Sequence, residues 1–329
     1  MAHIWSEGFD WANTSTELNT RLDSGSAPTT VTDTQFSYGR AVSGTAVKTL
    51  PGNYGEIFGS WRCRGISGTA WPRLALMDGT TSQVVFERSM DGRFYVQRGG
   101  TVLTSVLDDG NFQTWASYQF RVVIHNTAGI IQVRKNGSTT NLIDLTGANT
   151  RASANSYANK LQLYNNNGAY HDDIWLNDTT GTLNNSWPGD VRIITQFPSG
   201  AGTSTQFTPS TGSNWQCVDE APLNGDTDYV SSSTVGHKDL YTVAALGVTP
   251  TSIKCVSPFA LVKKADAGAR EVGVRHLSGA TEQTVASHSG LTSSTYQYVG
   301  GALETDPNTS AAWTLANVNA QQVGPVIVA

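Results

Sequence analysis

The sequence predicts an all-β protein made of two antiparallel β-sandwich domains. Along many short segments, apolar and polar residues alternate with the period of two that is typical of half-buried strands. Helical periodicity is nearly absent, whereas turn dipeptides such as Asp-Gly and Asn-Gly recur at close spacing. Charged residues make up 14% of the 329 residues. This is well below the usual share of about a quarter, so the sequence lacks the Glu and Lys that long surface helices need.

The clearest strand pattern lies in residues 115–137. One face of the first predicted strand carries its large apolar side chains, and the second strand continues that face: Tyr118, Phe120, Val122 and Ile124, then Ile131 and Val133. Asn136-Gly137 predicts a tight hairpin turn, because both central residues of a type I′ turn need a positive φ. Asp91-Gly92 and Asp78-Gly79 predict further turns between strands.

The strand pattern is interrupted once, by a polar stretch rich in Gly, Asn and Pro. We therefore expect a first domain over residues 1–180, a linker over 181–190 and a second domain over 191–329. A short helix is expected within residues 311–322 of the second domain. It would be opened by Asp306-Pro307, with Trp313, Ala316 and Val318 on one face.

The charge balance argues against two classes of partner. The net charge is −5 and the isoelectric point is about 5.6, with no cluster of Lys or Arg. Proteins that bind nucleic acids or anionic membranes concentrate basic residues on one face, so neither partner is expected. The amino-terminal residues show no signal-peptide pattern, and no apolar run is long enough to span a membrane. We expect synthesis in the cytoplasm without signal-directed export.

Three cysteines, Cys63, Cys217 and Cys255, lie far apart with no paired spacing. An odd number without a framework indicates thiols packed as small apolar groups in a reducing compartment. A Cys217–Cys255 disulfide is the alternative if the protein is oxidised.

Three motifs of the first domain resemble concanavalin A-like (laminin-G-like) jelly rolls: GFDW at Gly8–Trp11, W-x₂-Y-x-F-x-V from Trp115, and Y-x-DD-I-W-L-ND over residues 170–178. The resemblance implies that the first and last strands lie side by side, with Gly8–Trp11 paired to Asp172–Leu176. Phe9, Trp11, Ile174 and Leu176 would then seal one edge of the core. Trp175 would point the other way, toward the second domain, a partner or a ligand.

Three stretches of the second half resemble a module of tailed-bacteriophage structural proteins: residues 189–200, residues 205–241 and residues 306–324. The resemblance implies a non-enzymatic tail-associated or capsid-decorating component of the virion, held by contacts with other virion proteins. Closed symmetry is the default for such repeated parts, so a homo-oligomer is expected. The resemblance implies no ligand and no catalytic residues.

The carboxylates predict no catalytic pair. Glycosidases, common among jelly rolls, hold two carboxylates across one groove. Asp172 and Asp173 are adjacent, so on a regular strand they face opposite ways, one capping a turn and one solvated. His171 beside them is expected to be exposed. The single E-x-D motif, Glu304–Asp306, is followed by Pro307. We therefore expect no enzyme, and a polysaccharide depolymerase is the least favoured alternative.

Oxygen-donor side chains cluster at the end of the first domain. The candidate calcium ligands are Asn167, Asp172, Asp173 and Asp178, and Asp219–Asp228 forms a second acidic stretch. Their spacing matches no calcium-loop pattern. We therefore expect no cofactor, with calcium as the open alternative.

Aromatic side chains offer a possible ligand site in the first domain. Trp71, Tyr164, Tyr170 and Trp175 could stack on sugar rings, although most such residues in a sandwich belong to its core. A lectin that recognises host-surface glycan is therefore the alternative function.

Overall fold

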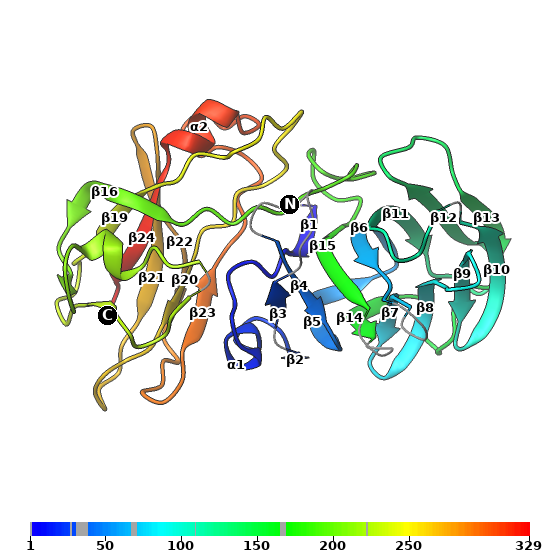
Figure 1. Cartoon of the computed structure of the whole chain (residues 1–329), viewed down its shortest axis with the longest axis horizontal. Helices are drawn as coiled ribbons and strands as arrows, with labels where there is room; N and C mark the ends of the chain where they lie inside the picture. The colour runs from blue at the N-terminus through cyan, green and yellow to red at the C-terminus, as the bar shows by residue number, and fades with distance from the viewer. Residues whose placement is uncertain are drawn as a thin grey trace. The chain divides into compact units, whose positions relative to one another are not determined.

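The computed structural model describes residues 2–26, 39–66, 71–108, 110–164, 169–221 and 223–329, and the backbone of 28–30. The chain divides into two compact units, Met1–Ile193 and Ile194–Ala329 (Figure 1). Residues 181–190, expected as a linker, are part of the first unit.

The first unit is a sandwich of two antiparallel sheets. The eight-stranded sheet has β1 (His3–Glu7) paired to β15 and otherwise runs in the order β13 (Ile143–Ala148), β12 (Gly129–Lys135), β11 (Ala116–Val123), β6 (Glu56–Arg64), β15 (Tyr170–Asn177), β4 (Arg40–Ser43), β3 (Pro28–Thr30). The seven-stranded sheet runs in the order β10 (Thr101–Leu107), β9 (Arg93–Arg98), β8 (Thr81–Arg88), β7 (Arg73–Asp78), β14 (Ala158–Tyr164), β5 (Ala46–Tyr54), β2 (Ser24–Gly25). A single-turn helix, α1 (Ser15–Leu18), follows β1. This arrangement is the expected jelly-roll sandwich.

The core lies between the two sheets and follows the predicted alternation. The apolar face predicted for residues 115–137 is buried: Tyr118, Phe120, Val122, Ile124, Ile131 and Val133. Asn136 and Gly137 have φ values of 49° and 75°, which confirms the predicted tight turn between β12 and β13.

The first and last strands pair as expected, but through different residues. β1 pairs with β15, with His3 opposite Asn177 and Glu7 opposite Ile174. The prediction that Gly8–Trp11 forms this strand is wrong, because the backbone leaves the ladder at Phe9, whose φ is +61°. Phe9 and Trp11 still reach the core, at 0% and 2% exposure.

The second unit is also antiparallel. Its five-stranded sheet runs β16 (Pro198–Thr205), β19 (Asp239–Val243), β24 (Gln322–Ile327), β21 (Val272–Ser278), β22 (Thr281–His288). Two short ladders accompany it: β17 (Thr208–Pro209) with β18 (Val230–Ser231), and β20 (Phe259–Val262) with β23 (Gln297–Gly300). The β20–β23 ladder packs against β21, β22 and β24. A buried cluster includes Phe207, Val272, Leu291 and Ile327.

The expected C-terminal helix is present but shorter. α2 spans Leu315–Ala320 and begins at Thr314, whose Oγ1 accepts a hydrogen bond from the Asn317 amide at 3.2 Å. Asp306-Pro307 does not open it, and Trp313 lies outside it, opposite Ile253 in an isolated bridge. A 3₁₀ turn, η1 (Asn214–Cys217), is also present. Within the described ranges, no helix has the length and apolar character to cross a membrane.

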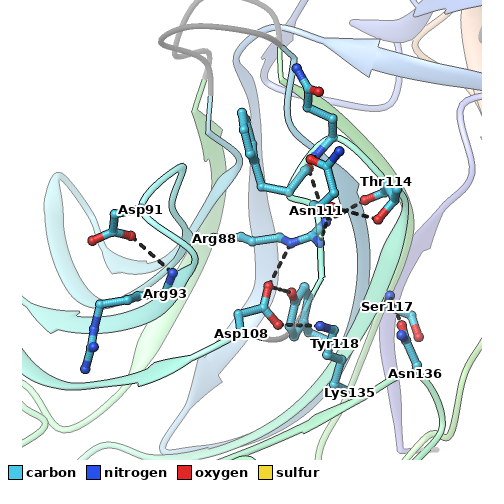
Figure 2. A network of polar contacts seen from close by, with 12 residues as sticks. Arg88, Asp91, Arg93, Asp108, Asn111, Thr114, Ser117, Tyr118, Lys135 and Asn136 are labelled. Atoms are coloured by element: carbon cyan, nitrogen blue, oxygen red, sulfur yellow. Dashed lines mark hydrogen bonds and ion pairs between the residues drawn. The ribbon is translucent and has the colours of Figure 1, made fainter.

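A buried polar network joins the two sheets of the first unit (Figure 2). The Arg88 guanidinium, at the end of β8, pairs with Asp108 through Nε at 2.9 Å. Asp108 also accepts from the hydroxyl of Tyr118 on β11 at 2.8 Å and pairs with Lys135 of β12 at 2.5 Å. Arg88 further donates to the carbonyl of Asn111 at 2.9 Å. A buried guanidinium is tolerable only with such partners, so the loss of one partner alone should be strongly destabilising.

We expect Asp108→Ala to lower the free energy of unfolding of the first unit by about 3–5 kcal/mol, because it leaves Arg88 buried without its counter-ion. Urea unfolding followed by tryptophan fluorescence measures this change. Glu56→Ala is the matched control. It breaks an ion pair with Arg121 whose side chains are 28% and 30% exposed, and such pairs contribute about 0.2–1 kcal/mol. Equal losses in the two variants would contradict the structural role of the network.

Candidate functional site

Part of the outer face of the eight-stranded sheet is covered by the end of the first unit. Residues 186–193 lie across it, held by three kinds of contact. The Trp187 ring lies 3.7 Å from the Arg134 guanidinium. The Gly189 amide donates to Gln119 Oε1 at 3.0 Å. Asp190 pairs with Arg62 at 2.7 Å. The chain itself therefore covers the part of this face that β6, β11 and β12 form.

Arg62 and Asp173, on the strands beneath residues 186–193, hold this segment on the sheet. Arg62 Nε lies 3.1 Å from Asp173 Oδ2, and Asp173 Oδ1 accepts a hydrogen bond from the Ile193 amide at 2.7 Å. Asp172 and Asp173 are each 2% exposed. The expectation that one of them is solvated is wrong. Asp173 adopts a left-handed backbone with φ of 48°, and the ladder shifts register between Asp172 and Trp175, so the regular alternation of faces fails there.

Several carboxylates in this region share a poorly solvated environment. Burial is the largest cause that raises the pKa of Asp10 to about 7 and of Asp173 to about 6. Burial and the neighbouring Asp173 also raise the pKa of Asp172. Raised carboxylate pKa values are common at catalytic sites. Here, however, the Asp172–Asp173 pair lies beneath residues 190–193, so we interpret it as a structural cluster.

Two further predictions for this strand are wrong. Trp175 is 3% exposed, its indole nitrogen donates to Asn177 Oδ1 at 2.8 Å, and its ring lies 4.5 Å from that of His3. The Trp175 side chain is therefore packed inside the first unit and cannot stack on a ligand. His171 is fully buried between the Trp61 indole N–H, at 3.1 Å, and the Tyr164 carbonyl, at 3.1 Å. Burial lowers its pKa to about 4.

The other candidate residues are dispersed. Asn167 lies outside the described residues. Asp178 accepts from the amide and hydroxyl of Thr180 at 2.9 and 2.7 Å, which makes it a turn cap. Trp71 is half-buried ahead of β7. Tyr170 lies opposite Arg64, whose guanidinium is 5.0 Å from its ring. In the part of the chain that is described, no group of three or more His, Cys, Asp or Glu side chains could hold a metal ion.

The outer face of the seven-stranded sheet, by contrast, carries a continuous row of half-buried polar and aromatic side chains. Cross-strand pairing sets them side by side on five adjacent strands. We call this set the tyrosine row: Ser105 (β10), Tyr95 (β9), Glu87 (β8), Arg73 (β7) and Tyr164 (β14). Their neighbours in sequence, such as Leu74, Phe86, Phe94 and Leu163, are fully buried, so the row must point away from the core.

Contacts within the tyrosine row hold Glu87, Arg73 and Tyr164, whereas the Tyr95 hydroxyl donates outside the row, to Asp91 Oδ2 at 2.6 Å. Arg73 Nε lies 3.1 Å from Glu87 Oε2, and the Arg73 guanidinium lies 5.2 Å from the Tyr164 ring. Gln97 also donates to Glu87 at 3.1 Å. Burial raises the pKa of Glu87, while Arg73 opposes that shift. At strand spacings of about 4.8 Å, the row is roughly 19 Å long, with its tyrosines roughly 14 Å apart.

An apolar strip lies beside the row on the same face. Ala75, Met77 and Val85 form a small buried cluster against which Tyr164 packs. Gln97 and Gln162 lie opposite Val85 and Ala75 in the ladder, so amide groups bound the strip on both sides. The face thus combines planar polar groups and aromatic rings, and the small apolar cluster among them is itself buried.

Of this arrangement, sequence reasoning singled out Tyr164 and missed Arg73, Glu87 and Tyr95. The signal that could have revealed Glu87 and Tyr95 was their place on the polar face of the alternating segments on either side of the Asp91-Gly92 turn. That hairpin is present, with Gly92 at φ of 78°.

Comparisons with known proteins extend to architecture only. No protein-family model and no curated protein matches the chain. Among solved structures, the galectin LEC-6 of Caenorhabditis elegans overlaps 41% of this chain and 94% of its own, at 12% identity and a TM-score of 0.30. The carbohydrate-binding module CBM66 of Bacillus subtilis overlaps 46% and 92%, at 9% identity and a TM-score of 0.30. Domains LG4-5 of the mouse laminin alpha1 chain overlap 86% and 78%, at 11% and 0.26. TM-scores this low do not identify a fold. The jelly-roll sandwich is therefore identified from the order of the strands in its two sheets.

The buried carboxylates lead to a prediction about pH. The raised pKa of Asp10 means that the folded state holds more protons than the unfolded state between about pH 4 and pH 7. Wild-type stability should therefore fall, relative to Asp10→Asn, as pH rises through that window. Asn keeps the oxygen that accepts from the Arg40 amide at 3.0 Å. Thermal unfolding of both proteins across pH 4–8 measures the difference.

His171 supplies a control of opposite sign, because its pKa is lowered to about 4. Wild-type stability should rise relative to His171→Gln between about pH 4 and pH 6.5. A stability difference between wild type and Asp10→Asn that does not change with pH would contradict the assignment.

Proposed function

We propose that this protein is a glycan-binding protein without catalytic activity, and that the tyrosine row of its first unit contacts the sugar. The observation that carries the proposal is the row itself. Sugars present hydroxyl groups at their edges and patches of C–H on their ring faces. Side chains that hydrogen-bond in fixed planes, next to aromatic rings, complement both surfaces.

The length of the row favours an oligosaccharide. Tyr95 and Tyr164 stand on either side of the Arg73–Glu87 pair, and the distance of roughly 14 Å between them exceeds one sugar ring. Each tyrosine can stack on its own ring while the ion pair binds the hydroxyl groups between them. The galectin and the carbohydrate-binding module among the similar solved structures are in keeping with this proposal, which does not depend on them.

The absence of catalysis is part of the proposal. A glycosidase needs two carboxylates about 5–9 Å apart on either side of a bound sugar. The tyrosine row contains one, Glu87, and its Oε2 is engaged by Arg73 and Gln97. Incubation with a bound oligosaccharide should release no reducing sugar.

The resemblance of residues 189–329 to tailed-phage structural proteins stays a prediction, as do partners in a virion. Nothing in the fold or in the comparisons shows a phage origin. Glycan recognition is compatible with a surface component of a particle, and mass spectrometry of purified particles tests the association.

The first test is a glycan array with the full chain, followed by calorimetry with the strongest soluble oligosaccharide. We expect Tyr95→Ala and Tyr164→Ala each to weaken binding by about tenfold, because one stacking contact is lost. Glu87→Gln should weaken it by a similar factor, because it removes the charge that orients Arg73.

Tyr170→Ala is the matched control, since Tyr170 is a half-buried tyrosine beside an arginine on the other sheet. It should bind like wild type. An array without signal, with and without calcium, would refute glycan binding. Equal weakening by Tyr170→Ala and Tyr164→Ala would place the site elsewhere.

A further inference from the structure

The four edge strands of the first unit differ in how they are protected from pairing with other chains. Exposed edge strands invite pairing with other chains, and proteins commonly shorten them or place Pro or charge there. β2 has two residues, β3 has three and includes Pro28, and β13 carries Asp144. β10, with the sequence TVLTSVL, has seven residues and no charge. Its Val102 and Leu107 are 51% and 69% exposed.

The ladder between β9 and β10 shows which backbone groups of β10 face outward. The Asp108 amide donates to the carbonyl of Gly92 at 2.8 Å, one step beyond the Leu107–Arg93 pair. Hydrogen-bonded and non-hydrogen-bonded pairs alternate in an antiparallel ladder. Ser105 and Leu107 therefore direct their amide and carbonyl groups away from β9. Among the described residues, no other strand pairs with β10.

We propose that β10 is a dimerisation edge, and that its occupant is β10 of a second copy of this chain, antiparallel and centred on Ser105. An uncharged strand meets its own copy without like-charge repulsion, and a two-fold axis makes the two edges self-complementary. In this register the two Ser105 residues exchange both backbone hydrogen bonds. Thr104 of each copy then lies opposite Val106 of the other, on either side of the Ser105 pair.

One contact must be released for this pairing. Arg93 reaches over the edge, with Nε 3.0 Å from Ser105 Oγ and Nη2 3.4 Å from the Ser105 carbonyl. The second is at the long limit of a hydrogen bond. A backbone amide of the second copy would replace this Arg93 contact with a hydrogen bond of normal length. The bulge at Val102–Thr104 limits the pairing to the residues of β10 that follow the bulge.

The pairing would also join two tyrosine rows. Ser105 ends the row in each copy, so the two rows would form one continuous row of roughly 40 Å across the axis. This consequence rests on the proposed glycan-binding function, whereas the pairing itself does not. A dimer would then bind a long polysaccharide through two linked sites and more tightly than either site alone.

The test uses the full chain without glycan. Sedimentation equilibrium should give a dimer mass for wild type, and Leu107→Lys should weaken association by roughly tenfold or more, because a lysine on an edge strand opposes its pairing with another strand. Ser105→Cys should form a disulfide-linked dimer under mild oxidation, because an opposed pair lies about 5.5 Å apart between Cα atoms.

Thr101→Cys is the matched control. Thr101 is exposed on the same strand, but in this register its two copies lie roughly 26 Å apart. Wild type corrects for the native thiols, of which Cys63 and Cys217 are buried. A monomeric wild type at about 100 μM, equal cross-linking at positions 101 and 105, or a dimer unaffected by Leu107→Lys would each overturn the proposal.

Tyr95→Ala and Tyr164→Ala should leave the dimer mass unchanged. Loss of glycan binding and loss of β10 pairing are therefore measured separately.

Discussion

The buried guanidinium of Arg62 is the interaction on which the architecture of the first unit depends. Its side chain is 4% exposed and contacts two carboxylates, Asp173 within β15 and Asp190 in the segment that crosses the sheet. Arginine suits this position because its planar fork engages two acceptors at fixed angles. By holding residues 186–193 on one sheet, it makes the two faces of the sandwich unequal. One face is partly covered by the chain, and the other presents the tyrosine row.

The same chemistry recurs between the two sheets of the sandwich. Arg88 connects β8 to Asp108 and to three carbonyls ahead of β11, while Lys135 supplies a second cation. Both networks place a charge where an all-apolar core would be simpler. Buried ion pairs add little net stability compared with apolar packing, but breaking one is costly. We interpret them as constraints that fix register, between the sheets in one case and between sheet and covering segment in the other.

Local patterning was enough to predict the all-β class, the hairpin at Asn136-Gly137 and the buried face of β11. It was not enough where distant segments meet. The tyrosine row depends on the pairing of β7 with β14, which lie far apart in sequence, and register between such strands is set by the whole core. The rule of alternating faces also failed at Asp173, where one residue with positive φ breaks the pleat. Residues 181–190 have no strand pattern, so nothing local indicated that Trp187 and Asp190 would be anchored.

The pairing of β1 with β15 has a consequence for how the protein is made. His3 opposes Asn177, so the first strand has no partner until nearly the whole first unit has left the ribosome. At about 5–20 residues per second, roughly 10 to 40 seconds of synthesis pass before this closure is possible. Hairpins such as β11–β12 can form meanwhile, but the non-local ladders must wait, and such topologies fold slowly. During that interval β1, β4 and β6 all lack β15, the strand that pairs with each of them, and their apolar side chains are exposed. The nascent chain is then most vulnerable to aggregation.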